Sequence, residues 1–124
     1  MRRTVVMLVA LALLACTAAA TALGAPRVPG FPALAGQWSH AEINVTIKRV
    51  PHTLILDQGR IRKASDTEIT LLEPDGTLAV IAVSPQTIVQ IRGRRRDISV
   101  LRRRMLVQTM RIDDGAAVRV RTAR

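Results

Sequence analysis

Acid–base and metal-ligand chemistry in this chain of 124 residues rests on two histidines and nine carboxylates. His40 and Glu42, in the stretch "HAE", place two metal-ligating side chains near each other. Imidazole and carboxylate both bind Zn²⁺, but a zinc site takes at least three protein ligands, and no third ligand follows at a clear spacing. The sequence therefore predicts no metal site and no cofactor.

Nucleophilic catalysis also lacks the residues that it needs. Four serines precede or follow the predicted strands without a base or a nucleophile elbow nearby, namely Ser39, Ser65, Ser84 and Ser99. The one cysteine, Cys16, has no partner for a disulfide or a metal cluster. The stretch "RGR" at 92–94 has a single glycine and does not form a phosphate-binding loop. We therefore expect a protein without enzymatic activity.

Positive charge is the most unusual feature of the chain, which has a formal net charge of +10 and a pI of about 11.7. Lys48 and Lys63 are the only lysines among the 19 basic residues, so arginine dominates. The guanidinium group binds phosphate and carboxylate with a bidentate fork. Residues 91–104, "IRGRRRDISVLRRR", hold the candidate polyanion-binding side chains: Arg92, Arg94, Arg95, Arg96, Arg102, Arg103 and Arg104.

Four interpretations of these arginines are open. They bind an anionic membrane surface or a cell-wall polymer, they bind nucleic acid, or they form a solvated surface without a ligand. Nucleic acid is disfavoured because single strands stack on aromatic side chains, and Phe31 and Trp38 are the only aromatic residues. The fourth interpretation is a protein–protein module that adds a partner strand along an exposed edge, at "TLILD" (53–57) or "TIVQI" (87–91).

Hydrophobic residues alternate with polar ones from Glu42 onward, which indicates β-strands. In "EINVTIKRV" the side chains of Ile43, Val45 and Ile47 share one face. Asp75-Gly76 and the segment Asp113 to Gly115 are turn sequences that predict two hairpins. The segment "DISVLRRRM" predicts a short helical turn that Asp97 caps. Six or seven short strands joined by tight turns predict an all-β domain, a small barrel or sandwich with one short helical turn.

The first thirty residues have the pattern of an export signal. Arg2 and Arg3 precede an apolar stretch from Val5 to Ala15, and small residues follow. Residues 13–16, "LLAC", resemble a bacterial lipobox, so Cys16 is a candidate for lipidation; cleavage near residue 24, or retention as a membrane anchor, are the alternatives. The expected organisation is a signal segment at 1–24, a linker rich in proline and glycine at 25–40, and a basic β-domain at 41–124.

A set of positions between residues 57 and 121 follows a pattern of strands and turns, namely Gly59, Ile61, Ile69 to Leu71, Asp75-Gly76, Ile81, Val83, Thr87, Asp97-Ile98, Ala117, Val118 and Val120. In these positions residues 57–121 resemble the exported bacterial domain-of-unknown-function family numbered 5666. A glycine that the family has after its "D-L" turn is replaced here by Leu101 and three arginines. The resemblance implies a small, closed or partly open six-stranded OB-like β-barrel and export, and it carries no catalytic residues.

The sequence thus predicts an exported, non-enzymatic module with an arginine-rich face, associated with the cell envelope. The expected location is the periplasm, the extracellular space or the outer side of the cytoplasmic membrane. The expected partner is anionic lipid or cell-wall polymer, and nucleic acid or a protein partner is the alternative.

Overall fold

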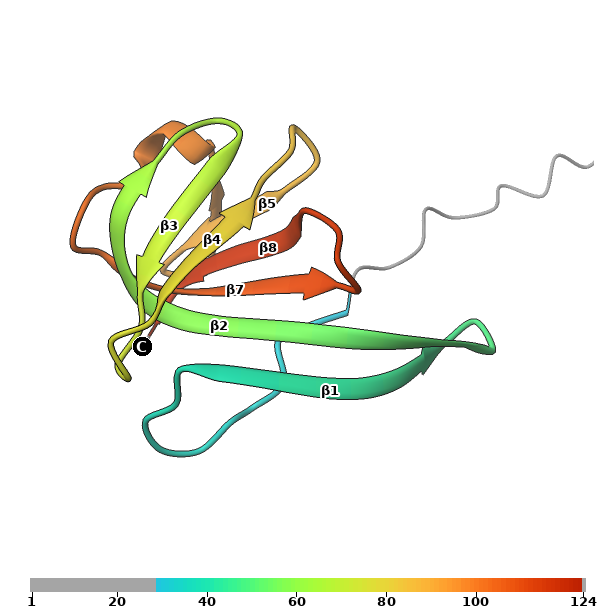
Figure 1. Ribbon diagram of the computed structural model, residues 1–124. Helices are drawn as coiled ribbons and strands as arrows, with labels where there is room; N and C mark the ends of the chain where they lie inside the picture. The colour runs from blue at the N-terminus through green and yellow to red at the C-terminus, as the bar shows by residue number, and fades with distance from the viewer. Residues whose placement is uncertain (1–28, 124) are drawn as a thin grey trace, which may run out of the picture.

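The computed structural model describes residues 29–123 (Figure 1). The predicted signal segment and Cys16 lie outside these residues. In the described part no helix has the length and apolar character needed to cross a membrane. The elements in chain order are β1 (His40–Ile47), β2 (Val50–Ala64), β3 (Glu68–Leu72), β4 (Leu78–Ala82), β5 (Ile88–Ile91), β6 (Arg94–Arg96), the 3-10 turn η1 (Ile98–Val100), β7 (Leu106–Ile112) and β8 (Ala117–Thr122).

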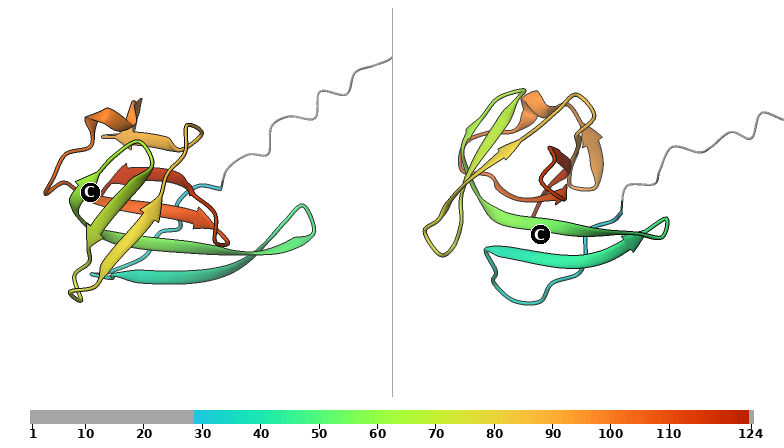
Figure 2. Two further views of the ribbon diagram at one scale, coloured as in Figure 1. Left: turned by 45° about the horizontal axis from the view of Figure 1, so that its top comes forward. Right: turned by 45° about the vertical axis from the view of Figure 1, so that its right-hand side comes forward.

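The all-β prediction is confirmed, but the sheet has eight strands and does not close into a barrel. Its order is β4-β3-β2-β7-β8-β5-β6, and β1 pairs with β2. Among the described strands, β5 and β8 form the one parallel pair. Strands β4 and β6 end the order without pairing with each other, and β6 has only three residues, too few to continue a ladder around a barrel. The β3–β4 hairpin folds over β7 and β8 instead (Figure 2).

Strand β2 organises the sheet because it has 15 residues and three partners. One edge of β2 pairs with β7 from Leu54 to Arg60. The other edge pairs with β1 as far as Asp57 and with β3 from Arg60 onward. The beginning of β1 and the end of β3 therefore meet beside residues 57–60. Gly59 stands at this junction, where an added Cβ would lie 2.6 Å from the carbonyl oxygen of Leu72.

The predicted hairpins at Asp75-Gly76 and at Asp113 to Gly115 are confirmed. Asp97 also caps η1 as expected, since its side chain accepts a hydrogen bond from the backbone N–H of Ser99. Predicting "TLILD" and "TIVQI" as edge strands was wrong. The first lies in β2 between β1 and β7, and the second contributes β5, between β8 and β6. Both backbone edges of each segment pair with a neighbouring strand, so neither segment is open to a partner strand.

The predicted strand "EINVTIKRV" instead reverses at Lys48-Arg49, where both residues have positive φ angles of 48° and 66°. Two residues with positive φ form a type I′ hairpin turn, which normally takes Asn and Gly. Side chains with a Cβ pay an energetic penalty in this left-handed region. The sequence does not reveal the turn, because neither residue is a turn former.

The double variant Lys48→Asn/Arg49→Gly should therefore stabilise the protein by roughly 1 kcal/mol, because Asn and Gly tolerate the left-handed conformation. Urea denaturation would measure the change. The matched substitution Lys63→Asn lies inside a strand and should not stabilise the protein. A destabilised double variant would contradict the assigned turn.

The buried apolar side chains form two clusters, and each cluster contains residues from a different half of β2. The larger one holds Ile61, Ile69, Leu71, Ile81, Val83, Val89, Leu101, Val107, Ala117 and Val120. The smaller one is built on Leu54, Leu56 and Met110. Phe31 and Trp38, from the segment predicted as a linker, pack against this smaller cluster together with Ile43 and Val45. The alternation predicted for β1 is confirmed, because its apolar side chains are half-buried and its polar ones exposed.

Candidate functional sites: a basic end and a buried His–carboxylate cluster

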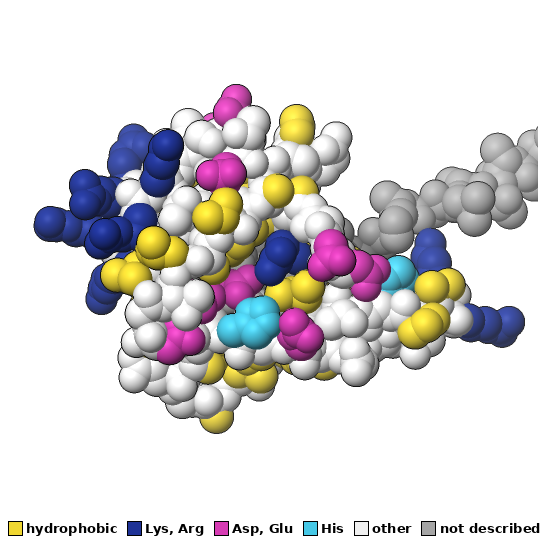
Figure 3. Space-filling view, viewed as in Figure 1, with side chains coloured by type: hydrophobic (Ala, Val, Ile, Leu, Met, Phe, Trp, Pro, Cys, Tyr) yellow, Lys and Arg dark blue, Asp and Glu magenta, His cyan; other side chains and the backbone are white. Residues whose placement is uncertain are grey.

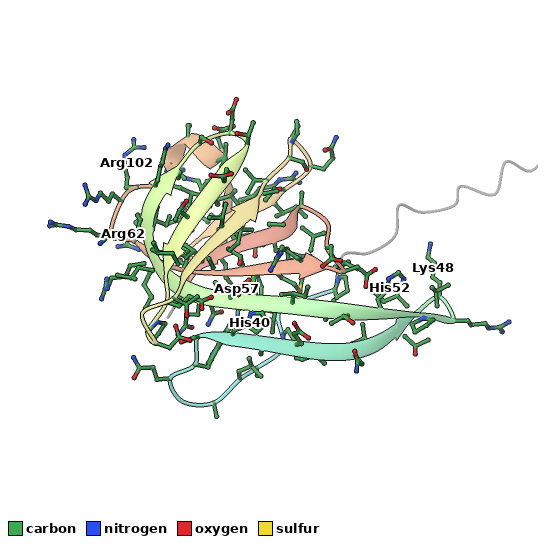
Figure 4. All side chains as sticks on the ribbon, viewed as in Figure 1. His40, Lys48, His52, Asp57, Arg62 and Arg102 are labelled. Carbon is green, nitrogen blue, oxygen red and sulfur yellow. The ribbon has the colours of Figure 1, made fainter. Side chains whose placement is uncertain are left out.

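The predicted polyanion-binding arginines lie in two groups. The first, here called the basic end, consists of Arg60 and Arg62 on β2 with Arg102, Arg103 and Arg104 of the loop before β7. Backbone hydrogen bonds between Ile61 and residues 104 and 105 hold the loop against the strand. Arg60 Nη1 also donates to the backbone oxygen of Arg104 at 3.1 Å. Arg62 and Arg102 both point outward at the same end of the molecule (Figure 4).

The second group lies on the β5–β6 hairpin. Arg92 and Gly93 form its turn with positive φ angles of 50° and 77°. Arg92, Arg94 and Arg96 line a groove of about 750 Å³ that Met105 and Thr122 also border. Side chains alternate along a strand, so Arg95 points to the other face of β6. The structure therefore brings three of these four arginines to one groove, beside the loop that carries the basic end.

Most basic side chains in the view of Figure 3 gather at one end, and acidic side chains lie around a histidine in the middle. Other basic side chains lie at the opposite end and in the middle of the same view. Among the described residues, none of Arg60, Arg62, Arg92, Arg94, Arg95, Arg96, Arg102, Arg103 and Arg104 forms an ion pair with a carboxylate. Arg60 and Arg102 each use one guanidinium nitrogen as a donor to backbone oxygens, and their other N–H groups stay available to an external anion.

The acidic region surrounds Asp57, a carboxylate that is only 2% exposed. Asp57 Oδ1 accepts a hydrogen bond from His40 Nδ1 at 2.7 Å, and Asp57 Oδ2 is 3.3 Å from Arg111 Nη2. His40 Nε2 lies 3.3 Å from Glu42 Oε1. His40 and Asp57 are cross-strand partners of β1 and β2, which explains their contact. Figure 4 shows these two side chains between the strands.

Glu73 completes the cluster from the end of β3. One ligand-type atom from each of His40, Asp57 and Glu73 lies within 4.8 Å of the other two. Glu73 is 5% exposed, and its Oε1 has no hydrogen-bond partner. Burial, and then the neighbouring carboxylate of Asp57, raise the pKa of Glu73 to about 7. The hydrogen bond to Asp57 raises the pKa of His40 above its ordinary value.

The sequence places His40 and Glu42 close together but does not connect them with Asp57 and Glu73. Asp57 is 17 residues from His40 and Glu73 is 33, so no local spacing links them. The available signal was the position of Asp57 itself, an acid directly after the apolar run "TLIL". A buried carboxylate needs polar partners, so this position predicts that other polar side chains lie close to Asp57.

No protein-family model, curated protein or solved structure matches this chain. The resemblance of residues 57–121 to the exported family numbered 5666 therefore stays a prediction. The geometry of the two groups of residues carries the functional argument.

Proposed function

We propose that this protein is an exported, non-enzymatic module of the cell envelope that binds a polyanion at its basic end. The observation that supports the proposal is a cluster of positive charge: five arginines gather on β2 and the loop before β7, and none has a carboxylate partner among the described residues. Phosphate and carboxylate groups fit the guanidinium fork. Anionic lipid and cell-wall polymer are the two sources of such groups that an exported protein meets.

Single-stranded nucleic acid is the less favoured ligand. Trp38 packs against the smaller hydrophobic cluster, and Phe31 lies beneath the guanidinium group of Arg121 at 4.1 Å. Neither ring belongs to the basic end, so stacked bases would have no aromatic platform there.

The first test compares two variants that each remove two positive charges. Arg62→Gln/Arg103→Gln alters the basic end, and Lys48→Gln/Arg49→Gln alters the hairpin tip at the other end of β2. Each basic residue near an anionic surface contributes about 1 kcal/mol, so the basic-end variant should bind anionic vesicles roughly thirtyfold more weakly. The tip variant should bind nearly as well as the unaltered protein. Co-sedimentation with vesicles of phosphatidylglycerol and phosphatidylcholine, at low salt and at about 0.15 M salt, measures both effects.

The same variants are then titrated with an isolated anionic wall polymer and with a single-stranded oligonucleotide. Stronger retention by the polymer than by vesicles would assign the wall as the source of the anion. Equal losses in the two variants would show that net charge alone drives binding, which would contradict a specific basic end. Preferential binding of the oligonucleotide would overturn the envelope proposal.

A further inference from the structure

The cluster around Asp57 contains buried polar atoms without hydrogen-bond partners, and the proposed binding of a polyanion does not explain them. Among the described residues, three buried side-chain polar atoms have no hydrogen-bond partner: Glu73 Oε1, Thr109 Oγ1 and Arg111 Nε. All three belong to this one region, because Arg111 contacts Asp57 and Thr109 is the cross-strand partner of Asp57. A buried polar atom without a partner is costly, and native proteins satisfy nearly all of them. Arg111 Nε–H is a donor that a cation cannot satisfy, whereas the carboxylate oxygen of Glu73 can bind one. The unpartnered acceptor on the buried Glu73 therefore indicates a site for a ligand.

The charges of the cluster define the sign of that ligand. Asp57, Glu73, Glu42 and Asp75 contribute four carboxyl groups, and Arg111 contributes one guanidinium group. Even with His40 protonated, ionisation of the carboxyl groups leaves two negative charges uncompensated, in a protein whose net charge is +10. Two buried carboxylates that face each other repel, and a divalent cation between them would reverse that repulsion.

We propose that His40, Asp57 and Glu73 form a binding site for a divalent transition-metal ion such as Zn²⁺. The side-chain types match, because Zn²⁺ takes imidazole nitrogen and carboxylate oxygen as ligands. Three protein ligands leave a fourth position for water. Ca²⁺ and Mg²⁺ prefer all-oxygen sites, so the imidazole favours a transition metal over both.

The spacing of the three side chains suits this coordination. Ligand atoms about 2.0–2.1 Å from a tetrahedral Zn²⁺ stand roughly 3.3 Å from one another. In the structure the three ligand-type atoms lie within 4.8 Å of one another, and His40 Nδ1 is 2.7 Å from Asp57 Oδ1. Small rotations of these side chains would therefore equalise the three distances.

The surrounding contacts hold the ligands in place. Glu42 Oε1 faces His40 Nε2, and Arg111 Nη2 faces Asp57 Oδ2. The ring nitrogen that does not bind the metal normally donates to a carboxylate, which fixes the tautomer of the imidazole. Here Nε2 would donate to Glu42, and Nδ1 would bind the metal. The imidazolium form of His40 has a proton on each ring nitrogen, so metal binding would release the Nδ1 proton to solvent and leave the Nε2 proton for Glu42. A neutral imidazole protonated at Nδ1 would move that proton to Nε2 without net release.

The test is calorimetric titration of the full-length protein with Zn²⁺ at about pH 7.5, after a chelator has been used and removed. We expect one Zn²⁺ per chain, with release of protons seen as a dependence of the binding heat on the buffer. His40→Gln and Glu73→Gln should each weaken binding more than about tenfold. The matched control is His52→Gln. His52 Nδ1 bonds Asp113 Oδ2 at 2.8 Å in a similar His–Asp pair that has no third ligand among the described residues, so this variant should bind Zn²⁺ normally.

A second measurement does not depend on any variant. Zn²⁺ should shift the imidazole NMR signals of His40 and leave those of His52 unchanged. Absence of binding at millimolar Zn²⁺ would overturn the proposal, and so would binding that Glu73→Gln and His40→Gln leave intact. Equal affinity for Mg²⁺ and Zn²⁺ would also overturn it, because the imidazole would then have no role.

Discussion

Glu73→Gln is expected to stabilise the metal-free protein near pH 8 and to change its stability little near pH 5. Burial and the carboxylate of Asp57 raise the pKa of Glu73 from 4.5 to about 7. A carboxyl group with a raised folded-state pKa binds its proton more tightly in the folded protein than in the unfolded chain. Its contribution is fully present below pH 4.5 and is lost as the pH rises through about 7.

The size of this loss follows from the shift, and is on the order of 3 kcal/mol at most when the pH is above 7. The amide that replaces the Glu73 carboxyl group would remain neutral at every pH and would not incur that loss. The raised pKa of His40 acts with the same sign, since its contribution is present below pH 6.5 and is lost as the pH rises through its folded-state value. The lowered pKa values of Asp75, Asp97 and Asp113 act separately, because the stability they contribute is lost only as the pH falls below 3.8.

Urea denaturation at several pH values between about 5 and 8, with a chelator present, measures the effect. The control is Glu68→Gln in the same hairpin, because Glu68 is exposed. Its stability should follow that of the unaltered protein throughout. If Glu73→Gln and the unaltered protein lost stability in parallel between pH 5 and 8, the buried carboxylate would not be the cause.

Gly59→Ala is expected to destabilise the protein by about 3 kcal/mol. The new Cβ would lie 2.6 Å from the oxygen and 2.9 Å from the carbon of the Leu72 carbonyl group. Both atoms belong to the backbone of β3, so no side-chain rotation relieves the collision, and one strand must move. The reduced freedom of alanine in the unfolded chain would offset less than about 1 kcal/mol of this cost.

Thermal and urea denaturation measure the loss, and Gly30→Ala is the control. A Cβ at Gly30 would meet no atom within 4 Å, so its stability should not fall. If Gly59→Ala were as stable as the control, the close approach of β2 and β3 would be wrong. Because Asp57 and Glu73 flank this approach, the geometry of the proposed metal site also depends on it.

The β-strands, two of the hairpins and the capped turn could be predicted from the sequence because each depends on neighbouring residues. Alternation of apolar and polar side chains marks β1, Asp75-Gly76 and Asp113 to Gly115 mark turns, and Asp97 marks the start of η1. The number of strands and the closure of the sheet could not be predicted correctly from the sequence. Lys48 and Arg49 carry no turn signal, so the reversal between β1 and β2 was missed, and a barrel was expected where the sheet stays open.

The charge of the arginines and of Asp57 is determined by the sequence alone, because charge and polarity belong to the side chains themselves. The arrangement of these groups depends on strand pairing between distant segments. Only the tertiary structure could show that β2 exchanges β1 for β3 beside Gly59, which places His40, Asp57 and Glu73 together. The packing of the whole core determines which distant strands pair. The spacing of residues along the sequence does not reveal that pairing.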